Sequence, residues 1–347
     1  MNNLHNFSSD KSCNKRPDMP IQASHYRGRF APSPSGLLHF GSLIAALASF
    51  LDAKSFVNSY GEHGKWLVRI EDIDPPREQQ GASAAILKTL EAFGLHWDET
   101  ELYQSTQSDY YRDILAHLAQ QKLSYYCQCT RANIKAIGGI YQGHCRITNH
   151  AADNNPPNVS APENGAIRLV NQYGLYQFDD IFQGQVNCDK ALANEDFIIH
   201  RKDGLFAYQL AVVADDITQG ITHVVRGCDL LEPTARQLTL YQTLHQSFAK
   251  VDFKTNATKE NCLKVITPQF GHIPLAVTSD GYKLSKQNKA PAIDNSKPQP
   301  ALIAALSFLG QAPLPELAQA NVEEIIQWAI THWQRDNVPK TVAVNIN

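Results

Sequence analysis

Three closely spaced cysteines form the first group of residues in this sequence that could bind a metal ion. Cys127 and Cys129 are separated by a single residue, and Cys145 follows in the same polar, glycine-containing stretch. A Cys-x-Cys turn can present two thiolates to one ion, and a closed structural zinc site takes four ligands. The candidates for a fourth ligand are Tyr141, His144 and a water molecule, and ligand chemistry alone favours His144.

A second group of residues is suited to binding the phosphates of a nucleotide. The stretch RFAPSPSG (29–36) is rich in turn formers and leads through LLHFGS (37–42) into an apolar, helix-like segment. The N–H groups at a helix N-terminus attract anions, Gly41 allows close approach, and His39 could hydrogen-bond a phosphate. Taken alone, His39 is better explained as a residue that caps an ordinary βα turn.

A third group lies far along the chain, in the sequence KLSKQ (283–287), which follows Asp280 and Gly281. Lys283 and Lys286 could contact separate phosphate oxygens and stabilise the charge that develops on a leaving pyrophosphate. On its own, this stretch is more typical of a solvated surface loop.

Together, these two phosphate-binding candidates resemble the HIGH and KMSKS signatures of class I aminoacyl-tRNA synthetases. The first, with RIEDID (69–74), resembles the glutamyl branch, and the likeness extends from about Tyr26 to Leu309. Ser42 stands in place of the last histidine of HIGH, and Gln287 in place of the last serine of KMSKS. The resemblance implies that His39 and Lys286 act in catalysis. It implies that ATP is bound by His39, Gly41, Ser42, Lys283, Ser285 and Lys286.

The resemblance also implies a pocket for glutamate, which carries two carboxylates and one ammonium group. Arginine pairs with carboxylates through its planar fork. We expect Glu71 to meet the ammonium group and Arg29 and Arg226 to meet the carboxylates; Arg29 is favoured for the side chain, but this assignment stays open. Without the resemblance, Arg69 and Glu71 would be interpreted as an exposed pair at a strand edge, and Tyr208 as a core aromatic. The implied glutamate-binding residues are Arg29, Phe30, Ala31, Pro32, Ser33, Glu71, Tyr208 and Arg226.

For the metal site, the resemblance favours Tyr141 over His144. Relatives with this Cys-x-Cys and Tyr-x-x-x-Cys spacing use the tyrosine, so the implied ligands of one structural Zn²⁺ per chain are Cys127, Cys129, Tyr141 and Cys145. The remaining cysteines are isolated, and we expect no metal-binding role for Cys13, Cys188, Cys228 and Cys262.

Strands and helices that alternate along the chain predict an α/β fold, and the resemblance implies a Rossmann-like domain with a parallel sheet. Apolar patterns predict strands at 26–31, 65–70, 206–213 and 223–225. They predict helices at 41–53, 82–93, 108–121, 233–245, 300–309 and 322–333. We expect a polar surface loop at 254–261.

These elements suggest five regions. Residues 1–24 are expected to be a disordered extension, 25–124 and 196–290 the two halves of the catalytic domain, 125–195 a small zinc-binding and acceptor-type insertion, and 291–347 a short helical region.

Composition narrows the class of protein. The chain is 43% hydrophobic and 19% charged with a net charge of −3, which argues against a protein that merely coats nucleic acid. No apolar run reaches the roughly 20 residues of a membrane span. An odd number of cysteines without a secretion signal predicts a reducing compartment, the cytoplasm. We expect a monomer that does not bind membranes.

The implied reaction is attack of the glutamate α-carboxylate on the α-phosphate of ATP, assisted by Mg²⁺. The chain ends at Asn347, soon after Lys286, so we expect no large anticodon-binding region. This resembles the paralogues that activate L-glutamate without tRNA and transfer it to queuosine in tRNA(Asp), as do HFGSLIAAL, SYYC and EDFIIHR. The alternatives are a truncated glutamyl-tRNA synthetase that charges a tRNA 3′ end and a non-catalytic, tRNA-binding paralogue.

Overall fold

The structure is a computed structural model that describes residues 25–146, 165–249, 265–279, 282–284 and 291–346. Its centre is a mostly parallel sheet, as predicted. Strand β1 pairs with β2 and β2 with β3, all in parallel, and a further sheet has the order β7-β6-β10-β9. The two sheets adjoin, because Thr222 N donates to Arg27 O over 2.9 Å beside β1. These strands are β1 (Arg27–Phe30), β2 (Lys65–Ile70), β3 (Leu102–Tyr103), β6 (Gln177–Asp180), β7 (Gly184–Asn187), β9 (His223–Gly227) and β10 (Gln269–Ile273).

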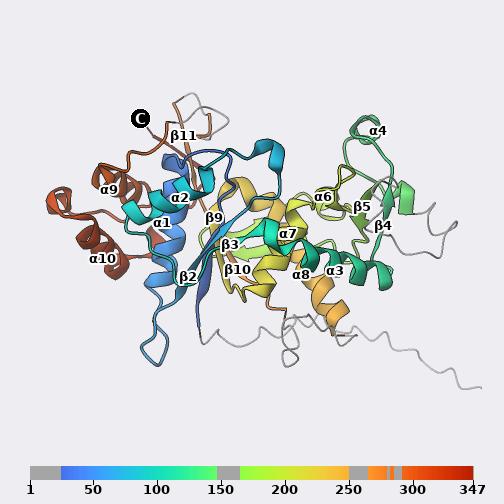
Figure 1. Ribbon diagram of the computed structural model, residues 1–347, viewed down its shortest axis with the longest axis horizontal. Helices are drawn as coiled ribbons and strands as arrows, with labels where there is room; N and C mark the ends of the chain where they lie inside the picture. Colours follow the sequence, from blue (N-terminus) through green and yellow to red (C-terminus); the bar gives the residue numbers. More distant parts are fainter. Residues whose placement is uncertain (1–24, 147–164, 250–264, 280–281, 285–290, 347) are drawn as a thin grey trace, which may run out of the picture.

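Helices cover both faces of this sheet (Figure 1). The side chains of each strand point alternately toward one helical layer and the other. In β2, Trp66 and Val68 pack into one core cluster, while Leu67 packs into the other. The first cluster includes α1 (Phe40–Lys54), α2 (Ala82–Ala92), α9 (Pro298–Phe308) and α10 (Val322–His332). The second includes α3 (Ser108–Gln120), α7 (Tyr208–Thr218) and α8 (Leu231–Phe248). Successive side chains along a strand point to opposite faces of the sheet. Every second residue of a strand therefore contacts the same layer of helices.

A smaller antiparallel sheet, in the order β4-β5-β8, carries the cysteine cluster. It consists of β4 (Ser124–Cys127), β5 (Ala166–Leu169) and β8 (Ile198–His200), accompanied by α4 (Arg131–Ala136) and α6 (Lys190–Ala193). Figure 1 shows β4, β5 and α4 at one end of the long axis and α9 and α10 at the other. Near the C-terminus, β12 (Ala343–Asn345) pairs in parallel with β11 (Leu275–Val277).

Most predicted elements are confirmed to within a few residues, but the strand predicted at 206–213 is wrong. This segment leads into helix α7, which begins at Tyr208 and ends at Thr218. Every residue from Leu210 to Ile217 is buried. A helix enclosed on all sides gives a continuous apolar run, which periodicity alone does not distinguish from a buried strand.

The helices described by the structure include none that is long and apolar enough to cross a membrane. The predicted extension at 1–24 and the predicted loop at 254–261 both lie outside the described residues.

Candidate functional site

Three arginines lie on the same face of the central sheet, the face covered by α7 and α8. In β1, Phe30 packs with the α1 cluster, so Arg29 points the other way. Arg69 shares the face of Leu67 in β2, and Arg226 shares the face of Val224 in β9. All three side chains are buried. Strand alternation therefore gathers three guanidinium groups near the carboxyl ends of adjacent parallel strands, where open α/β sheets bind ligands.

Two acidic residues of α7 balance part of this positive charge. Arg29 Nε donates to Asp216 Oδ1 over 3.1 Å, and Arg69 Nη2 donates to the same oxygen over 2.6 Å. Asp215 Oδ2 accepts from Gln104 Nε2 at 2.7 Å. Burial opposes ionisation of Asp216, yet Arg29 and Arg69 hold the pKa of its carboxyl below the ordinary value. Arg69 is thus a buried structural partner, and its interpretation as an exposed strand-edge residue is wrong.

A pocket of about 520 Å³, which includes space open to solvent, lies next to this network. Ser33, Glu71 and Tyr208 all line it. The first motif and the RIEDID segment are joined here, because Glu71 N donates to Pro32 O over 3.0 Å. Burial raises the pKa of Glu71 to about 7, although Arg69 and Arg29 oppose the shift. This carboxyl therefore titrates near neutrality beside a cluster of cations.

The other predicted glutamate-binding residues of RFAPSPSG (29–36) differ in how far their side chains are exposed to the pocket. Phe30 is buried on the opposite face of the sheet from Arg29, and its ring stacks on Trp66 with centroids 6.3 Å apart. A ligand contact by Phe30 would therefore have to use its backbone. Ala31 is partly exposed and Pro32 is buried, while Ser33 is exposed at the pocket.

Helix α1 begins directly after His39, which is its N-cap residue. His39 Nδ1 accepts a hydrogen bond from Ser42 N at 3.3 Å, so the capping role considered from the sequence is present. An acceptor Nδ1 leaves the ring proton of the neutral imidazole on Nε2, where it can be donated. The capping bond and a role toward phosphate are therefore compatible.

The described part of the lysine motif lies against this helix start. A Cβ atom added to Gly41 would come within 3.2 Å of Leu284 O, so the backbone of the motif passes directly over the glycine. Lys283 Nζ pairs with Asp229 Oδ2 at 2.5 Å. The structure brings the two phosphate-binding candidates together, although Ser285 and Lys286 lie outside the described residues.

The three predicted metal-binding cysteines also come together. The sulfur atoms of Cys127, Cys129 and Cys145 all lie within 4.8 Å of one another. A tetrahedral zinc site with Zn–S bonds of about 2.3 Å would separate its sulfurs by roughly 3.8 Å, so the cluster fits such an ion. The Tyr141 hydroxyl accepts from Cys145 N at 2.8 Å, and its ring packs with the three cysteines. His144 is exposed and is not part of the thiol cluster.

Sequence reasoning missed several residues that hold this site. Asp215 and Asp216 bind two of the arginines, Thr234, Gln237 and His272 bind the third, and Asp180 binds His272. The sequence did contain a signal for Asp215 and Asp216. They are adjacent acids inside the apolar run 210–217, and buried acids need charged or hydrogen-bonding partners. No local pattern marks the second group, since its members come from three separate parts of the chain.

Comparisons with known proteins agree with this geometry. The family model of class I tRNA synthetases (E and Q), catalytic domain, matches residues 25–333. A protein of Colwellia psychrerythraea named Glutamyl-Q tRNA(Asp) synthetase is 74% identical over 96% of this chain and 98% of its own. A protein of the same name from Escherichia coli K12 is 50% identical over 93% of each chain.

The fold is also found among solved structures. A glutamate-tRNA synthetase from Elizabethkingia anophelis superposes with a TM-score of 0.68 at 24% identity, over 93% of this chain and 68% of its own. The family match covers the three buried arginines, the pocket next to them, the start of α1 and the thiol cluster alike. This chain belongs to the class I aminoacyl-tRNA synthetases of the glutamate and glutamine branch, in the group of enzymes named Glutamyl-Q tRNA(Asp) synthetase.

Proposed function

We propose that this enzyme uses ATP to activate L-glutamate without tRNA and then transfers the glutamyl group to queuosine at the wobble position of tRNA(Asp). The observation that carries the first step is the approach of Leu284 O to Gly41, in the first turn of the helix that follows the pocket-lining Ser33. This contact supports the proposal because it joins the two phosphate-binding candidates, and the first of them begins at Arg29, one of the buried arginines. The names of the similar proteins support the acceptor.

In the first step, an oxygen of the glutamate α-carboxylate attacks the α-phosphorus of ATP. The bond from that phosphorus to the bridging oxygen breaks, and the products are glutamyl-adenylate and pyrophosphate. His39 would donate from Nε2 to a phosphate oxygen, and Lys286 would offset the charge on the leaving group. Mg²⁺ bound with ATP would neutralise phosphate charge. Glu71 would bind the substrate ammonium, with Arg29 and Arg226 at its carboxylates.

In the second step, a hydroxyl of queuosine attacks the carbonyl carbon of the adenylate. An ester forms, AMP leaves, and the hydroxyl proton is released. The thiol cluster takes no part in either step, because Zn²⁺ held by Cys127, Cys129, Tyr141 and Cys145 would be structural.

Pyrophosphate exchange tests the first step. The full-length protein with glutamate, ATP and Mg²⁺ should exchange labelled pyrophosphate into ATP in the absence of tRNA. Exchange that begins only when tRNA is added would contradict independent activation. The Lys286→Ala variant should exchange more slowly with nearly unchanged glutamate affinity, which distinguishes a role at pyrophosphate from one in the amino-acid pocket.

Labelled glutamate tests the second step. After transfer to queuosine-containing tRNA(Asp) and nuclease digestion, the label should be found on the wobble nucleotide. Label on the 3′-terminal adenosine would instead identify a truncated glutamyl-tRNA synthetase. Absence of both exchange and transfer would identify a non-catalytic paralogue.

A further inference from the structure

The guanidinium group of Arg226 is held by hydrogen bonds at two of its nitrogens, while the third has no partner in the part of the chain that the structure describes. Nε donates to His272 Nε2 over 3.1 Å. Nη2 donates to Thr234 Oγ1 and to Gln237 Oε1, each at 2.7 Å. Nη1 is buried without a hydrogen-bond partner among the described residues. A buried donor without an acceptor is unfavourable, so this nitrogen is where a carboxylate of the substrate would gain most.

The bond from Arg226 determines which nitrogen of His272 carries the proton. Arginine has donors only, so His272 Nε2 must be an unprotonated acceptor. The ring proton is then on Nδ1, which donates to Asp180 Oδ2 over 2.6 Å. Burial and the nearby Arg226 lower the pKa of His272, against the opposing effect of Asp180 and Asp229, so the ring is neutral. A second ring proton would set two donors facing each other.

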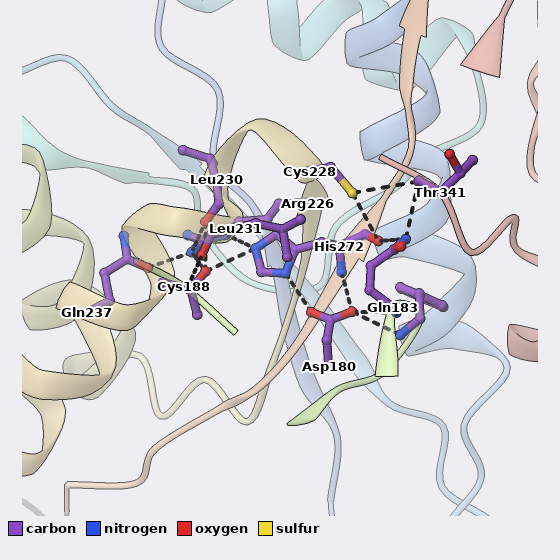
Figure 2. A network of polar contacts seen from close by, with 12 residues as sticks. Asp180, Gln183, Cys188, Arg226, Cys228, Leu230, Leu231, Gln237, His272 and Thr341 are labelled. Carbon is purple, nitrogen blue, oxygen red and sulfur yellow. Dashed lines mark hydrogen bonds and ion pairs between the residues drawn. The ribbon is translucent and has the colours of Figure 1, made fainter. Parts of the chain in front are cut away.

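Asp180 is in turn fixed by the backbone. Its Oδ1 accepts from the amides of Phe182 at 3.0 Å, Gln183 at 2.9 Å and His272 at 3.0 Å. The two carboxylate oxygens thus have separate tasks, because Oδ1 binds backbone N–H groups and Oδ2 binds the imidazole. Figure 2 shows Asp180, His272 and Arg226 in a row. They come from the adjacent strands β6, β10 and β9.

We propose that Asp180 and His272 are positioning residues that hold the guanidinium of Arg226 in the orientation that binds a carboxylate of the amino-acid substrate. The inference rests on the proposed function, which assigns Arg226 to that carboxylate. Neither residue need touch the substrate. Asp180 fixes the tautomer of His272, and His272 fixes the plane of the guanidinium through Nε. Nη2 is tied to α8, and Nη1 remains for the ligand.

The Asp180→Asn variant gives a sharp test, because it changes one atom and preserves volume. The three backbone N–H groups retain the side-chain oxygen at the Oδ1 position, which leaves the amide NH₂ facing His272 Nδ1. The imidazole must then carry its proton on Nε2, opposite the Nε–H of Arg226. We expect the KM for glutamate in pyrophosphate exchange to rise about tenfold or more, the usual scale for a charged hydrogen bond. The KM for ATP should be unchanged.

A matched control is provided by another buried acid, Asp196, which accepts from Tyr125 Oη at 2.7 Å and Asn171 N at 2.8 Å. The Asp196→Asn variant should leave the KM for glutamate unchanged, because it does not contact Arg226 or His272. An equal rise in both variants, or a rise in the KM for ATP equal to that for glutamate, would show that the effect of Asp180→Asn is only structural.

A measurement on the unaltered protein covers the case in which Asp180→Asn fails to fold. Nitrogen NMR of histidine-labelled protein, assigned with a His272→Phe variant, should show the Nδ1–H tautomer of His272 at neutral pH. The Nε2–H tautomer or a charged ring would overturn the proposal.

Arg226→Lys separates this proposal from the proposed function. If the unaltered protein exchanges pyrophosphate and Arg226→Lys raises the KM for glutamate, but Asp180→Asn does not, then only the positioning role fails. If exchange occurs but Arg226→Lys leaves that KM unchanged, the assignment of Arg226 and the positioning role fail while glutamate activation stands. If no glutamate-dependent exchange occurs, the proposed function itself fails.

Discussion

Arg29 Nε donates to Asp216 Oδ1 over 3.1 Å, and the two residues are 187 positions apart in the chain. The pair joins the first strand of the sheet to helix α7, and it sets the orientation of an arginine that we assign to glutamate. The same carboxylate also accepts from Arg69 Nη2 and from the hydroxyl of Tyr241 at 3.2 Å. Asp216 thus organises the buried side of the candidate pocket.

Replacing Asp216 should destabilise the protein strongly. Asp216→Asn leaves two buried guanidinium groups without their shared anion, and breaking a buried pair in this way costs about 3–5 kcal/mol of unfolding free energy. Urea unfolding at neutral pH measures the loss. Asp109→Asn is the control, because the Asp109 carboxylate is almost fully exposed and its pair with Arg112 lies on the surface. Its unfolding midpoint should hardly change.

The effect of Asp216 should also depend on pH in a defined direction. Arg29 and Arg69 hold the pKa of its carboxyl below the ordinary value, against the effect of burial. The stability that the carboxylate contributes is therefore present above the ordinary carboxyl pKa and is lost as the pH falls through the folded-state value. The difference in unfolding free energy between the unaltered protein and Asp216→Asn should shrink in acid. A difference that stays constant down to full protonation would contradict the ion pairing.

Glutamate should be preferred over glutamine by a large factor. The inferred pocket has Arg29 and Arg226 for two carboxylates, and glutamine would leave one guanidinium facing a neutral amide. Sites that use charged hydrogen bonds reject such analogues by roughly 10⁴-fold or more. Pyrophosphate exchange with each amino acid measures the ratio of kcat/KM. Comparable values for the two amino acids would refute the pocket.

Arg29→Lys tests which group provides this preference. Lysine retains a positive charge near Asp216 but loses the planar fork, so glutamate activation should fall while the KM for ATP changes little. The preference for glutamate over glutamine should narrow at the same time. If Arg29→Lys kept the same preference for glutamate, we would instead assign the side-chain carboxylate of glutamate to Arg226.

Binding of glutamate should weaken below pH 7 because of Glu71. Burial raises the pKa of this carboxyl to about 7 in the free protein. An ammonium group beside it favours the ionised form, so binding releases a proton whenever the carboxyl is initially protonated. The KM for glutamate should rise roughly tenfold between pH 8 and pH 6, since one pKa unit corresponds to a tenfold change in ionisation. The carboxylates and the ammonium group of free glutamate do not titrate in this range.

Glu71→Gln distinguishes this carboxyl from other titrating groups, such as Asp215, whose pKa burial raises to about 6. In the variant, the KM for glutamate should be higher at every pH and nearly independent of pH between 6 and 8. If the pH dependence of the KM for glutamate persisted in Glu71→Gln, a group other than Glu71 would be the one that titrates. The KM for ATP, measured over the same range, serves as the internal control.

Features that depend on local sequence could be predicted, and features that depend on long-range pairing could not. The apolar run KWLVRI predicted strand β2 with its bounds intact, since the signal lies within the strand. The spacing of Cys127 and Cys129 predicted the thiol cluster for the same reason. In contrast, Asp52 accepts from Arg335 Nε at 2.7 Å across 283 positions. Nothing near either residue predicts that contact, just as nothing near Arg226 predicts His272.

The thiol cluster should bind one structural zinc ion per chain that stabilises the fold. Because a metal bound only by the folded protein adds directly to stability, Cys127→Ser should lower zinc content and the unfolding temperature together. Metal analysis of freshly purified protein and thermal unfolding measure both. Cys188→Ser is the control, since Cys188 lies outside the cluster.

For the fourth ligand, Tyr141→Phe should lose zinc and His144→Ala should keep it, because the Tyr141 hydroxyl lies beside Cys145 whereas His144 is exposed. The reverse result would make His144 the ligand, and full-length protein without zinc would exclude the site.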